Sequence, residues 1–328
     1  MQPPAPCPRT PEISVIIPFL NEEENLPLIT AALEEYVPTL AVPVEVVFVD
    51  DGSTDGSCEW LRRAEFKNFS VKLVRFSRNF GSHPAVRAGF QQASAPNCVW
   101  LGADLQEPLE IIGEGYKRIQ EGYDLVLVQK NQVKVSKSEE TFSRLYSAMI
   151  RKWAIPGYPE KGVNTIFFNE KVKNALNANP ELNSSVVLQV ISLGFKQTVL
   201  NMNYREREHG SSKWTLGKKI KLLIDSFCSF SFFPIRMVSV LGFAFAFIGA
   251  LIALDLIIVR LFNIRPVTLG WPSLISVLMI GFGITNISLG IIAEYLWRAF
   301  DAARARPPFI IDTVESLAPQ PGNGDREA

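Results

Sequence analysis

The stretch that most constrains the fold of this chain is Val44–Ser57, with the sequence VEVVFVDDGSTDGS. Its apolar, β-branched first half predicts a strand that is buried on both faces, as in a parallel sheet. The strand ends at two adjacent carboxylates, Asp50 and Asp51, and the turn-forming residues after them predict a tight connection to a helix. Ligands bind at the carboxyl edge of open α/β sheets, so this loop is a candidate site, although one acidic loop alone is more typical of a solvated turn.

The same strand, turn and helix pattern recurs through the first 130 residues. Further strands are predicted at Ile13–Ile17, Val71–Phe76, Cys98–Leu101 and Leu125–Val128. The first helix is predicted to begin with Asn25 as its N-cap. This alternation predicts an α/β fold with a doubly wound, mostly parallel sheet.

Polar side chains follow four of these strands at the point where each strand ends. Right-handed crossovers place all such loops at one edge of a parallel sheet, so these side chains are expected to gather there. They are Asn21, Glu22, Asp50, Asp51, Arg78, Asn79, Asp104 and Gln106. Such an edge suits a nucleotide diphosphate with a cation, because Mg²⁺ or Mn²⁺ takes one or two carboxylates and leaves the other positions to phosphates.

Within this set, Asp104 is the expected metal ligand, with Gln106 as a neutral oxygen donor. Arg78 is expected either to neutralise phosphate or to form a structural ion pair, and both uses stay open. The chain has no G-x-G-x-x-G after its first strand and no G-x-x-x-x-G-K-[ST] motif. These absences argue against a dinucleotide oxidoreductase and against a P-loop ATPase.

Charge and cysteine content further narrow the classes of protein to which this chain could belong. Lys and Arg together number 33, as do Asp and Glu, so no overall charge favours a nucleic-acid partner. The four cysteines show no metal-binding or redox spacing, which fits a reducing compartment.

The last third of the chain is strongly apolar. Val238–Val259 contains one charged residue, Asp255, and Trp271–Ala293 contains none. Both are long enough to span a membrane, and apolar residues at helical spacing before them predict an interfacial helix. Lys and Arg are more frequent before the first span and after the second than between them, which predicts that both chain ends lie in the cytoplasm.

Four motifs resemble those of family-2 glycosyltransferases with the GT-A fold: ISVIIPFLNE, VVFVDDGSTDGS, FSRNFGSHPAVRAGF and GADLQEP. The later segments YREREHGSSKWTLGKKIKLLIDSF and RARPPFII are similar to the membrane-attached half of the polyisoprenyl-phosphate glycosyltransferases. The resemblance covers about Ile13–Ile311. It implies inverting transfer of a sugar from a UDP- or GDP-sugar to polyprenyl phosphate at the cytoplasmic face of a bacterial inner membrane, with Mg²⁺ or Mn²⁺. It also suggests a homo-oligomer, and leaves a separate flippase partner open.

The resemblance assigns roles to individual residues. The nucleotide-sugar contacts would be Pro18, Asn21, Glu22, Asp50, Asp51, Arg78, Asn79 and Gly81. The metal and diphosphate would be held by Asp104 and Gln106, and the catalytic residues would be Asp104, Asn164 and Arg207. The acceptor phosphate would be held by Arg205, Arg207 and Lys213. Contact with anionic lipid head groups is the alternative for basic residues in this region.

Two positions depart from the family pattern. Many relatives carry D-x-D where this chain has Gly102-Ala103-Asp104, and an acid where this chain has Asn164. Asn164 cannot act as a base, but a phosphate acceptor needs little basic help because its second pKa is about 6. The departures leave a non-catalytic paralogue that binds nucleotide sugar or lipid as one alternative. A processive polysaccharide synthase is another, although it would carry more spans and a Q-x-x-R-W motif.

The expected organisation has five parts. A flexible tail over 1–12 precedes a cytoplasmic GT-A catalytic domain over 13–212. An amphipathic juxtamembrane segment over 213–236, a two-helix transmembrane hairpin over 237–298 and a cytoplasmic C-terminal tail over 299–328 complete the chain.

Overall fold

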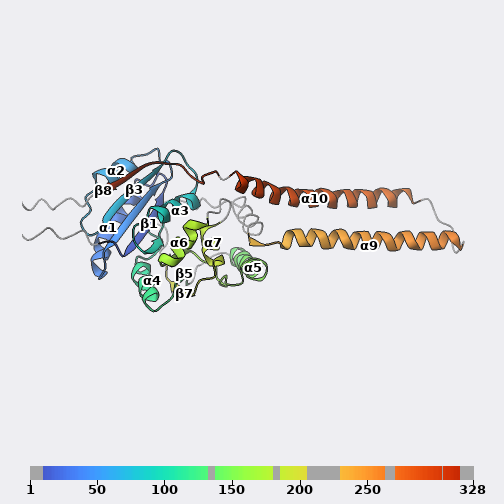
Figure 1. The fold of residues 1–328 in the computed structure, drawn as a ribbon, viewed down its shortest axis with the longest axis horizontal. Helices are drawn as coiled ribbons and strands as arrows, with labels where there is room; N and C mark the ends of the chain where they lie inside the picture. Colours follow the sequence, from blue (N-terminus) through green and yellow to red (C-terminus); the bar gives the residue numbers. More distant parts are fainter. Residues whose placement is uncertain are drawn as a thin grey trace, which may run out of the picture.

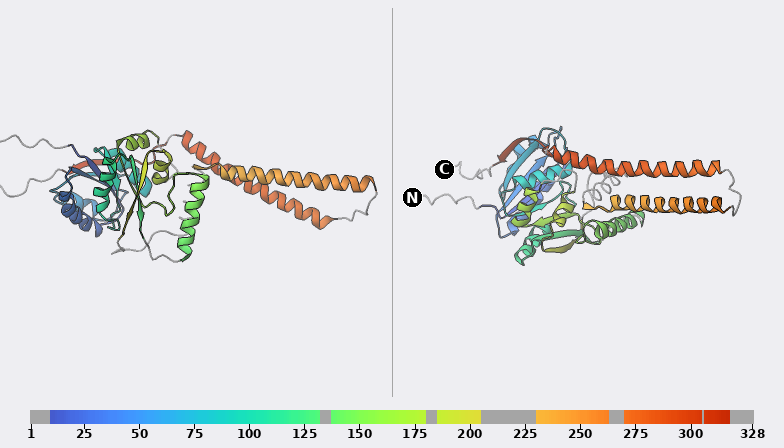
Figure 2. Two further views of the ribbon diagram at one scale, coloured as in Figure 1. Left: turned by 90° about the horizontal axis from the view of Figure 1, so that it is seen from below. Right: turned by 45° about the vertical axis from the view of Figure 1, so that its right-hand side comes forward.

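The computed structural model describes residues 10–131, 137–179, 185–204, 230–262, 270–304 and 306–317. An α/β domain carries two long helices that project from it in the same direction (Figures 1 and 2). Arg205, Arg207 and Lys213 lie outside the described residues, as does most of the predicted amphipathic segment.

The domain is built on an eight-stranded sheet with the order β7-β5-β6-β4-β1-β2-β3-β8. The strands are β1 Ile13–Phe19, β2 Val44–Asp50, β3 Ser70–Phe76, β4 Asn97–Trp100, β5 Leu125–Lys130, β6 Thr165–Phe168, β7 Gln197–Met202 and β8 Ile311–Leu317. Neighbours among β4, β1, β2 and β3 pair in parallel, whereas β6 and β8 pair antiparallel with their neighbours. The predicted mostly parallel sheet is therefore confirmed, and β6 and β8 make it a mixed one.

Helices cover both faces of the sheet. They are α1 Asn25–Tyr36, η1 Val37–Thr39, α2 Ser57–Arg63, α3 Ser82–Gln92, α4 Glu110–Gln120, α5 Lys137–Trp153, α6 Glu170–Ala178, α7 Val186–Ser192, α9 Phe233–Leu261 and α10 Trp271–Ala303. Helices α1, α2 and α4 bury their apolar side chains against one face, and α3, α6 and α7 against the other. Successive side chains of a strand point to opposite faces of the sheet and so pack into both cores. In β1, Val15 and Ile17 lie in the first core and Ile16 lies in the second. Because both faces are covered, ligand access is left to the strand ends.

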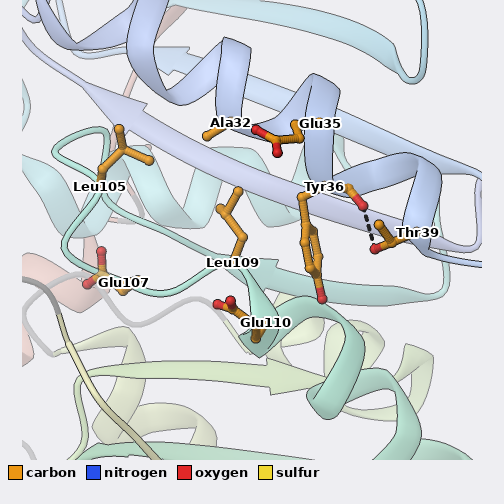
Figure 3. A pocket seen from close by; sticks show the side chains of 8 residues that line it. All are labelled: Ala32, Glu35, Tyr36, Thr39, Leu105, Glu107, Leu109 and Glu110. Carbon is orange, nitrogen blue, oxygen red and sulfur yellow. Dashed lines mark hydrogen bonds between the residues drawn. The ribbon is translucent and has the colours of Figure 1, made fainter.

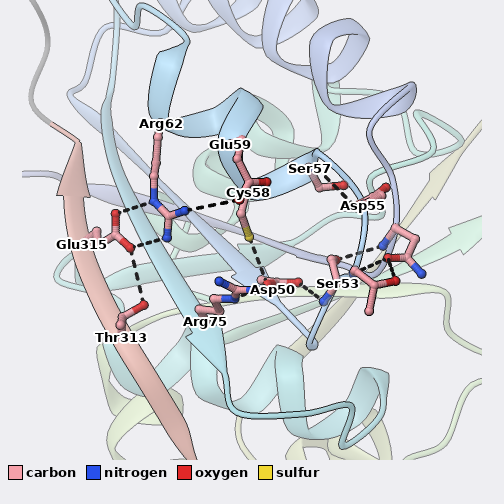
Figure 4. A network of polar contacts seen from close by, with 12 residues as sticks. Asp50, Ser53, Asp55, Ser57, Cys58, Glu59, Arg62, Arg75, Thr313 and Glu315 are labelled. Atoms are coloured by element: carbon pink, nitrogen blue, oxygen red, sulfur yellow. Dashed lines mark hydrogen bonds and ion pairs between the residues drawn. The ribbon is translucent and has the colours of Figure 1, made fainter.

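The C-terminal segment is part of the sheet, which corrects the prediction of a tail over 299–328. β8 pairs antiparallel with β3. Phe309, just before β8, stacks on Phe76 with ring centroids 5.1 Å apart. Arg62 on α2 donates two hydrogen bonds, of 2.9 and 2.7 Å, to the Glu315 carboxylate (Figure 4). Since β8 follows closely after α10, the edge of the sheet is tied to the base of that helix.

The two long helices expose many large apolar side chains. Phe243 on α9 is 76% exposed and Phe282 on α10 is 68% exposed. In the part of the chain that the structure describes, one stretch, Val277–Ala303, is long and apolar enough to cross a membrane, with a mean hydropathy of 1.7 over its most apolar part. The apolar stretch found in α9, Phe233–Gly249, is shorter. α10 is therefore the candidate span, and a second span in α9 stays a prediction.

Polar and aromatic contacts join the long helices to the domain at their base. The Trp153 ring at the end of α5 stacks on Phe233 at 4.3 Å, and Ser231 Oγ donates a 2.6 Å hydrogen bond to the Trp153 carbonyl. Tyr295 on α10 donates its hydroxyl to the Ser231 carbonyl at 2.7 Å. Helices α5, α9 and α10 thus meet at one point.

We predict that Glu315→Gln lowers the free energy of unfolding by about 0.2–1 kcal/mol at pH 7, as expected for a partly exposed ion pair. The Arg62 guanidinium lowers the pKa of Glu315, so its stabilisation is complete above the usual glutamate pKa of about 4.3. It is lost as the pH falls through the lowered value. Thermal unfolding of the detergent-solubilised chain against pH measures this difference.

Asp312→Asn is the matched control, since Asp312 is an exposed carboxylate on the same strand. A difference between wild type and Glu315→Gln that stays constant from pH 7 to pH 3.5 would contradict the ion-pair explanation.

Candidate functional site

The loops after β1 and β2 are hydrogen-bonded to each other at the carboxyl edge of the sheet. Asn21 N–H donates to Ser53 Oγ at 2.9 Å, and Asn21 Oδ1 accepts from Thr54 N at 2.8 Å. Asn21 has a φ of 54°, in the left-handed region that asparagine tolerates better than most residues. Glu22 N–H donates to Ser57 Oγ at 3.1 Å. Asn21 and Glu22 therefore lie against the β2–α2 turn, as their strand-end positions predict.

Asp50 orders this turn from inside the protein. Its Oδ1 accepts from Ser53 N at 2.7 Å and its Oδ2 from Cys58 Sγ at 3.0 Å, while Arg75 Nε lies 3.2 Å from Oδ2 (Figure 4). Burial, together with this carboxylate, raises the pKa of the Cys58 thiol to about 12. Asp50 is 0% exposed and supports the turn from inside in this structure, so its contact with the nucleotide sugar stays a prediction.

Asp51 joins the end of β2 to the loop after β3. Its Oδ1 accepts from Phe80 N at 2.7 Å, and its Oδ2 accepts from Gly81 N at 2.9 Å. Burial raises the pKa of Asp51, the two backbone donors oppose that rise, and neighbouring Asp50 adds to it. Asp51 therefore sets the shape of the loop that contains Gly81.

Gly52 allows these two loops to meet. It has a φ of 79°, and a Cβ at this position would lie 2.6 Å from the carbonyl carbon of Arg78. Arg78 and Asn79 are exposed on the loop surface, with the Arg78 guanidinium 4.1 Å above the Phe80 ring. Among the residues that the structure describes, no salt bridge involves Arg78. Both predicted uses of Arg78, neutralising phosphate and forming a structural ion pair, stay predictions.

The loop after β4 brings a second carboxylate to Asp104. Glu107 Oε2 accepts a 3.2 Å hydrogen bond from Gly102 N. A Cβ on Gly102 would lie 2.9 Å from Asp104 Oδ1 and 3.1 Å from Glu107 Oε2, so both carboxylates border the same small volume. Burial raises the pKa of Glu107, and the nearby Asp104 charge raises it further. Sequence reasoning missed Glu107; its signal was an acid three residues after Asp104 within one short loop.

These side chains fit a hard divalent cation. Asp104 and Glu107 provide carboxylate oxygens, and Gln106 in the same loop carries an amide oxygen. Within the described ranges, no cluster of three or more His, Cys, Asp and Glu side chains is placed to hold a metal. The donor set therefore suits Mg²⁺ or Mn²⁺ bound by one or two carboxylates, with phosphate and water completing the coordination.

Asn164 reaches the same edge from the antiparallel strand β6, which begins there. Its N–H donates to the Val128 carbonyl at 3.0 Å, and its Oδ1 accepts from Lys130 N at 3.3 Å. The next residue, Thr165, donates its hydroxyl to the carbonyl of Trp100 at the end of β4. Asn164 thus lies across the end of β5 and next to the strand that leads to Asp104.

A cavity of about 280 Å³ opens between α1 and the β4–α4 loop (Figure 3). Its lining consists of Ala32, Glu35, Tyr36, Thr39, Leu105, Glu107, Leu109 and Glu110. Glu107 is therefore shared between this cavity and the volume beside Asp104, whereas none of the residues predicted from the sequence lines the cavity.

Comparison with known proteins shows which family this chain belongs to. Residues 14–174 match the model of glycosyl transferase family 2. Over 316 residues the chain is 32% identical to an undecaprenyl-phosphate 4-deoxy-4-formamido-L-arabinose transferase of Pseudomonas fluorescens (strain SBW25), covering 94% of this chain and 92% of that protein. The chain belongs to glycosyltransferase family 2.

One further relative and one solved structure are also similar to this chain. The uncharacterized glycosyltransferase YkcC of Bacillus subtilis (strain 168) is 32% identical over 305 residues, with 92% of this chain and 93% of that protein covered. Among solved structures, the mannosyltransferase PcManGT of Pyrobaculum calidifontis, in complex with GDP-Man and Mn²⁺, aligns with a TM-score of 0.42 and 17% identity. That alignment covers 90% of this chain and 76% of PcManGT.

We predict that Gly52→Ala destabilises the chain more than Gly122→Ala does. Both glycines have positive φ, 79° and 88°, so both variants carry the cost of a side chain in the left-handed region, about 1 kcal/mol. Only at Gly52 would the added Cβ meet backbone atoms, whereas nothing lies within 4 Å of it at Gly122. Chemical or thermal unfolding measures the difference, and equal losses would show that the contact with Arg78 is unimportant.

Proposed function

We propose that this chain is a polyprenyl-phosphate glycosyltransferase, which moves one sugar from a UDP- or GDP-sugar to polyprenyl phosphate. The observation that carries this proposal is the extent of the likeness to the undecaprenyl-phosphate transferase, which covers 94% of the chain. An alignment of that length includes the long helices as well as the α/β domain. A likeness confined to the nucleotide half would say nothing about the acceptor.

The architecture supports a lipid acceptor. The sugar donor is water-soluble, whereas a polyprenyl phosphate is confined to the bilayer with its phosphate at the surface. An enzyme that joins them needs a polar site held beside the membrane. Here the apolar helix α10 meets the domain through Tyr295 and through the segment that leads to β8. We infer that α9 and α10 form a hairpin in a bacterial inner membrane, with the α/β domain in the cytoplasm.

The residues of the sheet edge divide into donor and acceptor roles in this proposal. Asn21, Glu22 and Asp51, with Pro18 beside them in β1, bind the nucleotide or shape the surface that does. Arg78, Asn79 and Gly81 face the diphosphate. Asp104 and Gln106 hold the cation, which offsets negative charge on the departing diphosphate when bound. Asn164 faces the acceptor, and Arg205, Arg207 and Lys213 bind its phosphate.

The proposed reaction is a single displacement. An oxygen of the lipid phosphate forms the new bond to the anomeric carbon as the bond from that carbon to the nucleotide diphosphate breaks. The diphosphate leaves with the electron pair, so the anomeric configuration inverts. Because the acceptor phosphate is already ionised near neutral pH, Asn164 need not remove a proton.

We predict that the purified full-length chain, given Mn²⁺ and undecaprenyl phosphate, forms a lipid-linked sugar from one member of a panel of radiolabelled UDP- and GDP-sugars. Asp104→Asn is expected to reduce turnover by about 100-fold or more. It removes a carboxylate charge that holds the cation, and the cation would stabilise the negative charge on the departing diphosphate. Extraction and thin-layer chromatography of the lipid fraction measure both. Asp312→Asn is the control, and a matched reaction with chelator tests the cation.

The alternatives give different products in the same assay. Binding of a nucleotide sugar without turnover across the whole panel would identify a non-catalytic paralogue. A ladder of products carrying several sugars would identify a processive synthase. Either result would contradict the proposed function.

A further inference from the structure

Glu107 is held in place by a turn that reverses the chain after Asp104. Leu105 lies in the left-handed region with a φ of 53°, which is uncommon for a leucine. The turn brings the Glu107 carboxylate back to the backbone N–H of Gly102, at 3.2 Å. Residues 102 and 107 are therefore neighbours in space although five positions apart in sequence.

The absence of a side chain at residue 102 is what gives the Glu107 carboxylate its room. A Cβ built on Gly102 would stand 3.1 Å from Glu107 Oε2, closer than most such contacts, and 2.9 Å from Asp104 Oδ1. Any larger side chain at residue 102 would enter the volume that these two carboxylates border. Gly102 is also the position at which the D-x-D pattern of many relatives has its first acid.

Two ionised carboxylates that border one small volume repel each other, and either a cation or a shared proton relieves this repulsion. The positive charge of Lys130 also acts on Glu107, and Lys130 Nζ lies 5.4 Å from the centroid of the Tyr204 ring. Two carboxylates beside one small volume favour a divalent ion, which binds through carboxylate oxygens.

We propose that Glu107 is a carboxylate ligand of the divalent cation together with Asp104, and that it supplies from position 107 the acid that Gly102 lacks. This inference rests on the proposed function of the site. A purely structural role, in which Glu107 only accepts the hydrogen bond from Gly102, is the alternative to be tested. Glutamine at position 107 keeps that hydrogen-bond acceptor and removes the charge, so it separates the two roles.

The test measures Mn²⁺ binding to the full-length chain in detergent, with UDP or GDP present, by the loss of the electron paramagnetic resonance signal of free Mn²⁺. Glu107→Gln is expected to weaken Mn²⁺ binding about tenfold or more, because even outer-shell changes at metal sites cost 10–100-fold. Without metal, its unfolding temperature is expected to equal or exceed that of wild type, because the substitution removes a charge beside Asp104. Glu110→Gln removes an exposed carboxylate at the start of α4 and is expected to leave Mn²⁺ binding unchanged.

A relocation variant tests the geometric part of the proposal. Glu107→Ala removes the carboxylate and opens the space beside residue 102, and it is expected to weaken Mn²⁺ binding as Glu107→Gln does. The double variant G102D/E107A places a carboxylate on the other side of the same volume, and is expected to bind Mn²⁺ more tightly than Glu107→Ala alone.

The outcomes separate this inference from the function on which it rests. Wild-type Mn²⁺ affinity in Glu107→Gln, or an equal loss in Glu110→Gln, would overturn the role of Glu107 while leaving sugar transfer intact. The opposite result is that no donor gives sugar transfer, while the wild-type chain binds Mn²⁺ and Glu107→Gln weakens that binding. This result would overturn the proposed reaction but support Glu107 as a ligand.

Discussion

Two adjacent carboxylates at the end of β2 hold the carboxyl edge of the sheet together. Asp50 turns inward and accepts from the Ser53 backbone and the Cys58 thiol, while Asp51 accepts from the backbone of Phe80 and Gly81. Each carboxylate accepts hydrogen bonds from donors of the protein in place of water. A polar loop can therefore be buried without leaving these charges unsatisfied. The loops after β1 and β3 are therefore held against the loop that contains this pair.

The same edge is connected mechanically to the apolar helices. The loop that Asp51 shapes contains Phe80, whose ring contacts Phe76, and Phe76 stacks in turn on Phe309. Phe309 belongs to the segment that returns from α10 to form β8. A continuous line of aromatic packing therefore runs from the carboxyl edge of the sheet to the strand that follows the candidate membrane span. In the proposed function, this packing would hold the nucleotide-sugar site at a fixed distance from the bilayer.

The loop after β4 departs from the usual local rules. Asp104 and Glu107 border the same small volume, and Leu105 between them has a φ of 53°, in a region that few residues other than glycine adopt. Natural proteins break such local rules most often at functional sites. The buried Asp50 differs, because its contacts are satisfied within the protein and stabilise the loop directly.

The sequence by itself determined the parallel centre of the sheet, because short apolar, β-branched runs that alternate with helical segments have few other ways to bury their side chains. It also placed Asn21, Asp51 and Asp104 at strand ends. The tertiary structure alone decided the pairing of β8 with β3, since partners more than 200 residues apart leave no local pattern. It likewise decided that Asp50 faces the interior and that Glu107 turns back to Gly102, because side-chain direction in a loop depends on backbone torsions and on neighbours that adjacent residues do not specify.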